Sequence, residues 1–187
     1  TAVGDDIILD TGANNFGTVR LNAGNATIAD ANDIILGTST LTGLTVTATT
    51  GNITQAAALS LTGAGDFSAG ANVTLGTAAN NFSTVALSAG NATVVDTDDI
   101  VLGTTTVTGL TVTAGNAGNI TQSGTVSATG ISNLTAADDD IILGTAANNF
   151  GTVALIAGNA TIVDANDIIL GTSTLTGLTV TATTGNI

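Results

Sequence analysis

The sequence contains no cysteine, histidine, methionine, proline, tryptophan or tyrosine, and its only basic residue is Arg20. The absence of cysteine rules out a disulfide framework and a thiolate metal site. A net charge of −13 disfavours nucleic acid as a partner, because binding to phosphates needs Lys and Arg to displace counterions. The same shortage of basic residues disfavours binding to anionic membrane surfaces.

Long apolar runs and targeting signals are also missing. Gly, Thr, Asn or Asp interrupts every apolar run within a few residues, so no segment reaches the ~18 residues of a membrane-spanning helix. The first residues, TAVGDDIIL, have neither the basic nor the apolar region of a signal peptide. What is present is Val, Ile, Leu and Ala interspersed with Thr and Gly, a composition that favours β-strands over helices and over disorder.

Internal repetition is the dominant feature of the chain. Residues 5–53 align without a gap with residues 139–187, and 44 of the 49 positions are identical. Phe16, Phe82 and Phe150 mark equivalent places 66 and 68 residues apart. The chain therefore divides into long repeats at approximately 5–71, 72–138 and 139–187, of which the last is truncated. We expect residues 1–187 to be one continuous segment of a longer array.

A shorter unit recurs inside the long repeat. It opens with Asp or Asn, followed by a β-branched residue, any residue, and then Leu or Gln. The polar opening residues are Asp6, Asp33, Asn52, Asn72, Asp99, Asn119, Asp140, Asp167 and Asn186. Their spacings are 27, 19, 20, 27, 20, 21, 27 and 19 residues. We interpret this as three units per long repeat of ~67 residues, one of which carries about seven extra residues.

Units of about 20 residues with short alternating runs predict an all-β fold, a parallel β-helix or β-solenoid. Each run is too short to bury itself, but coils stacked at ~4.8 Å complete both a backbone ladder and an apolar interior. Neither end of the chain shows a polar cap. We therefore expect neighbouring repeats, or other copies stacked end to end, as partners. The three equivalent Phe are expected to pack in the core or at a corner, three coils apart.

The run from GNITQ through NVTLGTAANNFSTV and ALSAGNATVVD to DDIVLGTTTVTGLTVTA resembles the repeat regions of filamentous-haemagglutinin-like adhesins. Those are very large bacterial surface proteins, typically exported by two-partner secretion. The resemblance covers the whole chain. It implies a right-handed parallel β-helix that forms a long rod outside the cell and takes part in adhesion to a host-cell or other receptor, or in surface coating. No part of the chain matches the secretion-recognition domain of that family.

Enzymatic activity is disfavoured by the residues available. Polysaccharide lyases on β-helices use a base such as Lys, Arg, His or Tyr, and the only such residue, Arg20, is replaced by Ala154 in the duplicate. Hydrolysis needs two carboxylates across a groove, but the Asp residues recur with the array and mark no unique cleft. No P-loop, nucleophile elbow or zinc motif is present. We therefore predict a non-enzymatic stalk or filament segment, with no required cofactor.

Two further readings remain open. Ice binding would use Thr-x-Thr pairs stacked in rows on successive coils. The pairs Thr45/Thr47, Thr111/Thr113 and Thr179/Thr181 occur in only one coil of three, so we expect adjacent coils not to continue the rows. Asn-x-Ser/Thr triplets such as Asn25-Ala26-Thr27 could accept glycans, although turns that favour Asn and strands that favour Thr produce the same triplet.

The polar opening residues are most simply explained as a ladder of side chains at solenoid corners. For Asn52, Asn72, Asp99, Asn119 and Asn186 this structural ladder is the only role we assign. Three equivalent corners lie at residues 30–33, 96–99 and 164–167. A calcium site is the sharper hypothesis at the first and third of them, since Asp33 should lie one coil from Asp6, and Asp167 one coil from Asp140. Calcium takes six to eight oxygen ligands of the kind found there. The candidate ligands are Asp6, Asp30, Asn32, Asp33, Asp140, Asp164, Asn166 and Asp167.

Overall fold

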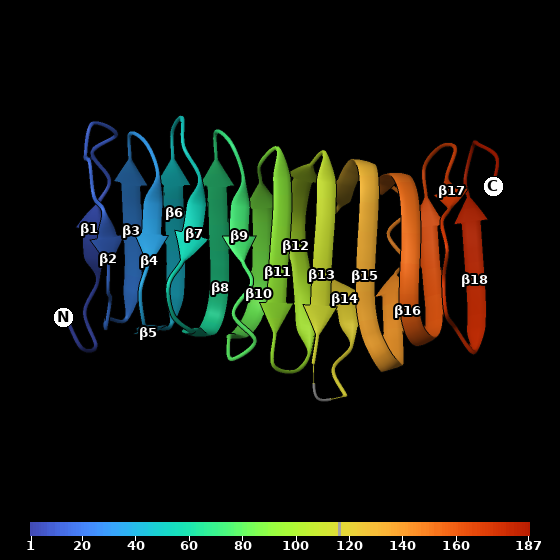
Figure 1. Cartoon of the computed structure of the whole chain (residues 1–187), viewed down its shortest axis with the longest axis horizontal. Helices are drawn as coiled ribbons and strands as arrows, with labels where there is room; N and C mark the ends of the chain where they lie inside the picture. The colour runs from blue at the N-terminus through green and yellow to red at the C-terminus, as the bar shows by residue number, and fades with distance from the viewer. Residues whose placement is uncertain (116) are drawn as a thin grey trace.

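The computed structural model describes residues 1–115 and 117–187 and is a parallel β-solenoid of about nine turns, with successive coils about 19 residues apart (Figure 1). All of the described strand pairs are parallel, and most strands in the middle of the rod pair with strands one coil before and one coil after them. Those residues contain no helix that could span a membrane. The all-β solenoid predicted from the repeat is thus confirmed.

Eighteen strands form the coils in the part of the chain that the structure describes. In chain order they are β1 (Ile7–Leu9), β2 (Thr18–Val19), β3 (Asn25–Asp30), β4 (Ile34–Leu36), β5 (Ser39–Leu41), β6 (Gly43–Ala48), β7 (Ile53–Gln55), β8 (Leu59–Ala69), β9 (Val73–Leu75), β10 (Asn81–Ser88), β11 (Asn91–Asp96), β12 (Ile100–Val107), β13 (Gly109–Ala114), β14 (Ile120–Gln122), β15 (Val126–Leu143), β16 (Asn149–Asp164), β17 (Ile169–Leu170) and β18 (Gly177–Ala182).

The core consists of files of aliphatic side chains that run along the rod. In β6, for example, Leu44, Val46 and Ala48 are buried, while the residues between them face outward. This alternation follows from the period of two in a strand. Because the coils are in register, each inward residue stacks on the equivalent residue of the next coil. One such file is Ile34, Ile53, Val73, Ala92 and Leu110.

The same file contains a polar exception. Ser132 follows Leu110 and precedes Val153, and its fully buried hydroxyl has no hydrogen-bond partner. A buried hydroxyl without a partner costs about 1–3 kcal/mol. The equivalent place in the preceding long repeat is Gly65, where the Phe67 ring lies against the Cα. The core is therefore packed differently in the two repeats.

The long repeat spans about three and a half coils, so the prediction of three coils is wrong. Three coil steps lead from Leu44 through Gly65 and Val85 to Leu102, eight residues short of Leu110. Leu110 instead pairs with Ala92, in a file about half a coil away. The physical reason is that the 27-residue spacing is one coil of 19 residues plus roughly another half coil.

Equivalent residues therefore alternate between opposite sides of the rod. Leu178 pairs with Ala160, in a file that leads back through Ile141 and Ile120 to Ile100 of β12. That is the side on which Leu44 lies, seven coils earlier. The first and third copies therefore present the same side, and the middle copy presents the opposite one.

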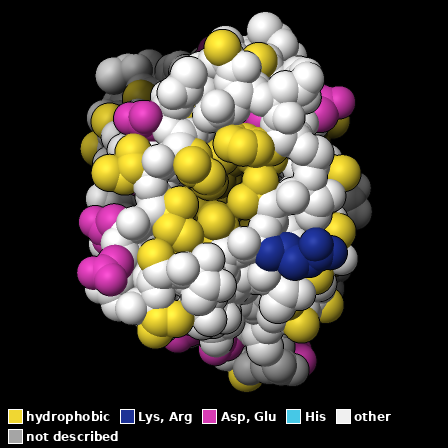
Figure 2. All heavy atoms as spheres, turned by 90° about the vertical axis from the view of Figure 1, so that its left-hand side faces the viewer, with side chains coloured by type: hydrophobic (Ala, Val, Ile, Leu, Met, Phe, Trp, Pro, Cys, Tyr) yellow, Lys and Arg dark blue, Asp and Glu magenta, His cyan; other side chains and the backbone are white. Residues whose placement is uncertain are grey.

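The phenylalanines pack as predicted, although three and a half coils separate their equivalent places. Phe82 and Phe150 are buried, Phe67 meets Phe82 edge to face at 6.3 Å, and Phe16 is half-buried in the first coils. At the N-terminal end of the rod, apolar side chains of the core are uncovered, and the single basic side chain lies beside them (Figure 2). At the other end Ile169 and Leu178 are exposed. No described helix covers either end.

Candidate functional site: side-chain ladders and polar corners

The most extensive polar feature is a ladder of side chains on four successive coils, which we call the first long ladder: Asp33, Asn52, Asn72 and Asn91. The side-chain Nδ2 of Asn52 donates to Asp33 Oδ1 at 3.0 Å, Asn72 Nδ2 to Asn52 Oδ1 at 3.3 Å, and Asn91 Nδ2 to Asn72 Oδ1 at 3.0 Å. Each backbone N–H donates to the same oxygen, at 2.7, 3.1 and 3.0 Å. Every amide thus points its nitrogen towards Asp33.

This polarity explains which residue stands at each end. The carboxylate of Asp33 can only accept hydrogen bonds, and it accepts them at the end towards which all the N–H groups point. At the opposite end Gly109 follows Asn91 in register, and a Cβ on Gly109 would lie 2.5 Å from Asn91 Oδ1. Only glycine fits there without moving the asparagine. Asp at the start and Gly at the end are therefore the two terminators of a ladder.

A second long ladder, on the opposite side of the rod, has Asp99, Asn119, Asp140 and Asn159 and ends at Gly177. Asn119 Nδ2 donates to Asp99 Oδ1 at 3.0 Å, and Asn159 Nδ2 donates to Asp140 Oδ1 at 3.1 Å. Between them, only the backbone N–H of Asp140 reaches Asn119 Oδ1, at 3.1 Å. An ionised carboxylate has no hydrogen to donate, so Asp140 interrupts this ladder.

The ladder contacts act on the first carboxylates. The backbone N–H of Asn52 and then its side-chain amide hold the pKa of Asp33 below its usual value, and Asn119 does the same for the pKa of Asp99. Hydrogen bonds to the charged form cause this direction. A lowered pKa contributes stability that is present above the unfolded-state value of 3.8 and is lost as the pH falls through the folded-state value.

Shorter ladders complete the set. Asn25 donates to Asp6 and is followed by Gly43, and Asn186 donates to Asp167. The structural ladder predicted for Asn52, Asn72, Asp99, Asn119 and Asn186 is thus seen in hydrogen bonds. Asn25, Asn91 and Asn159 also belong to ladders. The sequence analysis did not place them there, although their 19-residue distance from the preceding Asp or Asn was available as a signal.

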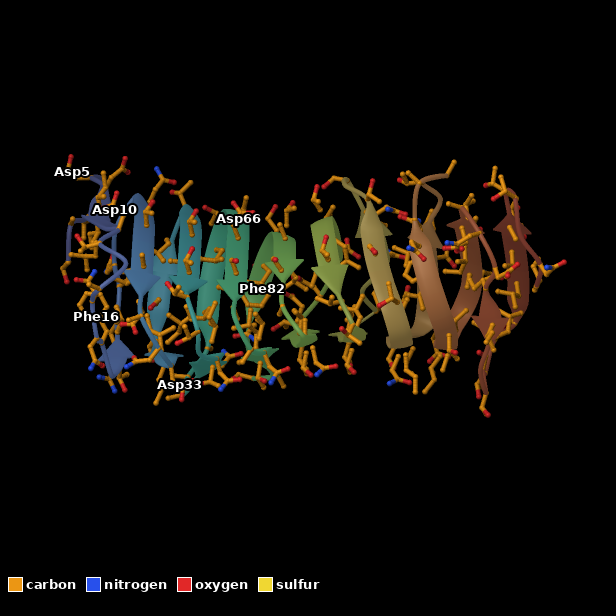
Figure 3. The ribbon with its side chains drawn as sticks, turned by 90° about the horizontal axis from the view of Figure 1, so that it is seen from above. Asp5, Asp10, Phe16, Asp33, Asp66 and Phe82 are labelled. Atoms are coloured by element: carbon orange, nitrogen blue, oxygen red, sulfur yellow. The ribbon has the colours of Figure 1, made fainter. Side chains whose placement is uncertain are left out.

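The carboxylate pairs assumed for calcium are not formed. Asp6 is one coil from Asn25, and Asp33 is one coil from Asn52, because the 27-residue step carries the chain to the other side of the rod. Asp33 lies on the side away from Asp5 and Asp10 (Figure 3). Asp140 and Asp167 are separated in the same way, with Asn159 and Asn186 as their neighbours.

Among the described residues, no three side chains of the Asp, Glu, His or Cys type converge on a point that could hold a metal ion. The pairing behind the calcium hypothesis is therefore wrong, and calcium binding stays an untested prediction.

The remaining calcium candidates, Asp30, Asn32, Asp164 and Asn166, lie at the first and third of three equivalent corners, and the middle corner, which was not a candidate site, shows the same arrangement at Asp96. Asp96 is buried and accepts the backbone N–H of Phe82 at 2.6 Å and that of Asp98 at 3.1 Å. Its carboxylate therefore fixes the turn rather than facing solvent. The equivalent acceptors are Asp30, bonded to Phe16 and Asn32, and Asp164, bonded to Phe150 and Asn166.

The middle corner differs from the other two by one charge. Position 98 is Asp, whereas the equivalent positions 32 and 166 are Asn. Burial raises the pKa of Asp96 to about 6, the backbone N–H groups of Asp98 and Phe82 oppose this rise, and the carboxylate of Asp98 adds to it.

The middle and third corners are each joined to the coil before them by a buried asparagine. Asn80 Nδ2 donates to the backbone oxygens of Leu75 and Val95 at 3.2 and 3.0 Å, and its Oδ1 accepts from Leu59 N at 3.0 Å. Gln55 and Asn80 exchange two side-chain hydrogen bonds of 2.7 and 2.9 Å. Asn148 and Gln122 repeat the arrangement. Sequence reasoning missed these residues, although the recurrent NNF and NITQ segments contain them.

Outward-facing threonines also form files along the rod. Thr54, Thr74, Thr93 and Thr111 are in register on four successive coils. This file consists of single threonines, and the half-coil offset aligns them from different parts of the long repeat. The Thr-x-Thr pairs themselves are not continued in the neighbouring coils, because Thr111 and Thr113 pair with Thr93 and Val95 on one side and with Asn133 and Thr135 on the other.

Two shallow hollows lie on opposite sides of the rod. One, of about 180 Å³, is bordered by Thr45, Asp66, Ser68, Ala86, Ser88 and Thr106. The other, of about 310 Å³, lies beside Gly109 and is bordered by Asn91, Thr93, Thr111, Ile131 and Asn133. Both are open, and neither brings together an acid, a base and a nucleophile.

Comparison with known proteins gives one match. A family model described as repeats of unknown function (DUF5649) matches residues 23–88 and 89–157. The two matched stretches adjoin and have nearly the period found in the sequence. No curated protein and no solved structure matches the chain.

Proposed function

We propose that this chain, which belongs to the family of repeats of unknown function DUF5649, is a non-enzymatic structural segment of a large extracellular bacterial surface protein. In this proposal the segment is part of a stalk or filament that holds adhesive parts away from the cell. The observation that carries the proposal is the stack of about nine coils with an aliphatic core, in which the described residues form no recess of catalytic character.

The mechanical role follows from how the coils are joined. Every coil contributes backbone hydrogen bonds to both neighbours, and the ladders and corner amides add side-chain bonds between coils. Nine coils at ~4.8 Å give a rod of about 43 Å. Because each coil contacts only its neighbours, further repeats extend the rod without changing the existing contacts.

The extracellular location and the adhesive role depend on the resemblance to filamentous-haemagglutinin-like repeats. Composition agrees with an exported rod, since the chain has no cysteine and only one site for trypsin-like proteases. The long repeat also alternates between two sides of the rod, so a tandem array displays the same surface in two directions. A receptor could then engage the array from either side.

Force spectroscopy tests the structural role. When the chain is pulled from its ends, we expect coils to unravel from the rod in steps, each releasing about 19 residues, or about 65 Å of extended chain. A single low-force event that releases the whole chain would contradict a load-bearing solenoid. For location, proteinase K treatment of intact source cells should release peptides of this chain. Protection of the chain until the cells are lysed would rule out surface display.

A further inference from the structure

One side of the rod carries an ordered, uncharged array of polar side chains, which we call the Asn/Thr face. Thr54, Thr74, Thr93 and Thr111 form one column on four successive coils. Each of them lies between buried residues of its strand, such as Val73 and Leu75 on either side of Thr74, so the threonine side chains point outward.

A second column runs parallel to the first. Two residues before each of the first three threonines stand Asn52, Asn72 and Asn91, which are the asparagines of the first long ladder. The recurrent Asn-x-Thr triplet is therefore two outward columns separated by one core residue. This gives the triplet a structural origin that needs no glycan.

The geometry of the Asn/Thr face is fixed by the sheet. Columns repeat at ~4.8 Å from coil to coil and lie about 6.6 Å apart along the strands. The asparagines are held by their ladder bonds, and threonine has a restricted χ1 angle. No charged residue stands in either column between Asn52 and Thr111. The array ends at Thr111, and its last residues, Asn91, Thr93 and Thr111, border the hollow at Gly109.

We propose that the Asn/Thr face binds the surface of ice. A crystal of water offers rows of donors and acceptors at regular intervals, and this face presents rigid, uncharged donors and acceptors that are also evenly spaced. Charged side chains would instead hold their own hydration shells. A sugar ring is the less suitable occupant, because sugars commonly stack on aromatic rings and Phe67, Phe82 and Phe150 are all buried. This activity is separate from the role of the rod as a stalk.

The opposite side supplies a matched control. There Thr47, Ser68, Ser88, Thr106 and Ser127 are also in register on successive coils. However, the central residues of this column are serines, which lack the methyl group and the χ1 restriction of threonine. The charged Asp66 stands two residues before Ser68, whereas no charged residue lies in the corresponding columns of the Asn/Thr face. We expect this side not to bind ice.

The test compares the two sides in the same assay. We would measure thermal hysteresis and ice-crystal shape for the wild-type chain, for Thr74→Tyr and Thr93→Tyr, and for Ser68→Tyr and Ser88→Tyr. Tyrosine is well tolerated on exposed strands, but its side chain projects beyond a column of threonines or serines. Circular dichroism melting of each variant shows that it is folded. We expect hysteresis and faceted crystals with the wild type, loss of both in the two Thr variants, and retention in the two Ser variants.

Three results would overturn the proposal. One is a wild-type chain that leaves ice growth unchanged, and another is equal loss of hysteresis in the Thr and Ser variants. The third is binding of the wild-type chain to an insoluble neutral polysaccharide such as cellulose in the absence of hysteresis, which would assign the face to glycans. None of these results would alter the unravelling of coils under force, so the stalk proposal is tested independently.

Discussion

The two long ladders differ at one rung, and the difference shows what such a ladder requires. The first runs Asp33, Asn52, Asn72 and Asn91 with an unbroken series of side-chain hydrogen bonds. In the second, Asp140 stands where the first has Asn72, and the series stops between Asn119 and Asp140. Both ladders have the same backbone register, and each ends at a glycine, Gly109 in the first and Gly177 in the second.

An amide can serve as a middle rung because it is both donor and acceptor, whereas a carboxylate is only an acceptor. Aspartate is therefore suited to the first rung and unsuited to an inner one. The first ladder obeys this rule at every position, and the second breaks it once. The comparison therefore predicts that Asn72→Asp destabilises the chain and that Asp140→Asn stabilises it.

The largest effect is expected for Asn72→Asp in the intact ladder. It removes the donor to Asn52 Oδ1 and places a carboxylate against that oxygen, so we expect a loss of about 2 kcal/mol in the free energy of unfolding at neutral pH. Urea denaturation measures this loss in the free energy of unfolding. The loss should shrink below pH 4, because the introduced Asp can donate a hydrogen bond again once it is protonated. The control is Asp66→Asn, which changes one charge in the opposite sense outside any ladder. A loss that does not depend on pH would contradict the donor argument.

The reverse exchange, Asp140→Asn, should stabilise the second ladder. The new Nδ2 group would donate to Asn119 Oδ1, as Asn72 does to Asn52, and one negative charge is removed from an acidic chain. We expect a gain of about 1 kcal/mol, measured by the same denaturation. Asp66→Asn again separates the effect of charge from that of the ladder. If both variants are stabilised equally, the gain comes from charge alone and the rung is irrelevant.

The sequence was sufficient for the fold because the signals were local and repeated. Alternating β-branched residues and a 19–21-residue recurrence of Asp or Asn predicted stacked parallel coils, and the ladder role of Asn52 and Asn72 followed from the same recurrence. The 27-residue step was misinterpreted, because similarity between copies does not reveal how far the chain has turned about the rod axis. That error produced both the count of three coils and the pairing of Asp6 with Asp33.

The corner contacts could not be predicted for a different reason. Asn80 and Gln55 are 25 residues apart and meet only because one coil stacks on another at a corner. Their residue types are ordinary for turns, so composition alone gives them no distinct role. Asp164 was likewise taken as a possible metal ligand at a solvated corner. Its burial and its bonds to backbone N–H groups appear only when the coil is closed.

The smallest effect is expected where the middle corner differs from the third. Asp98→Asn gives the middle corner the residue found at position 166, and it should lower the pKa of Asp96 from about 6 because a neighbouring negative charge is removed. Carboxyl ¹³C chemical shifts during an NMR titration measure this pKa.

A raised folded-state pKa contributes stability that is fully present below pH 3.8 and is lost as the pH rises towards 6. The wild type should therefore lose more stability than Asp98→Asn over that interval. If the pKa of Asp96 does not move in Asp98→Asn, burial governs this carboxyl group and the charge at position 98 has no influence on it.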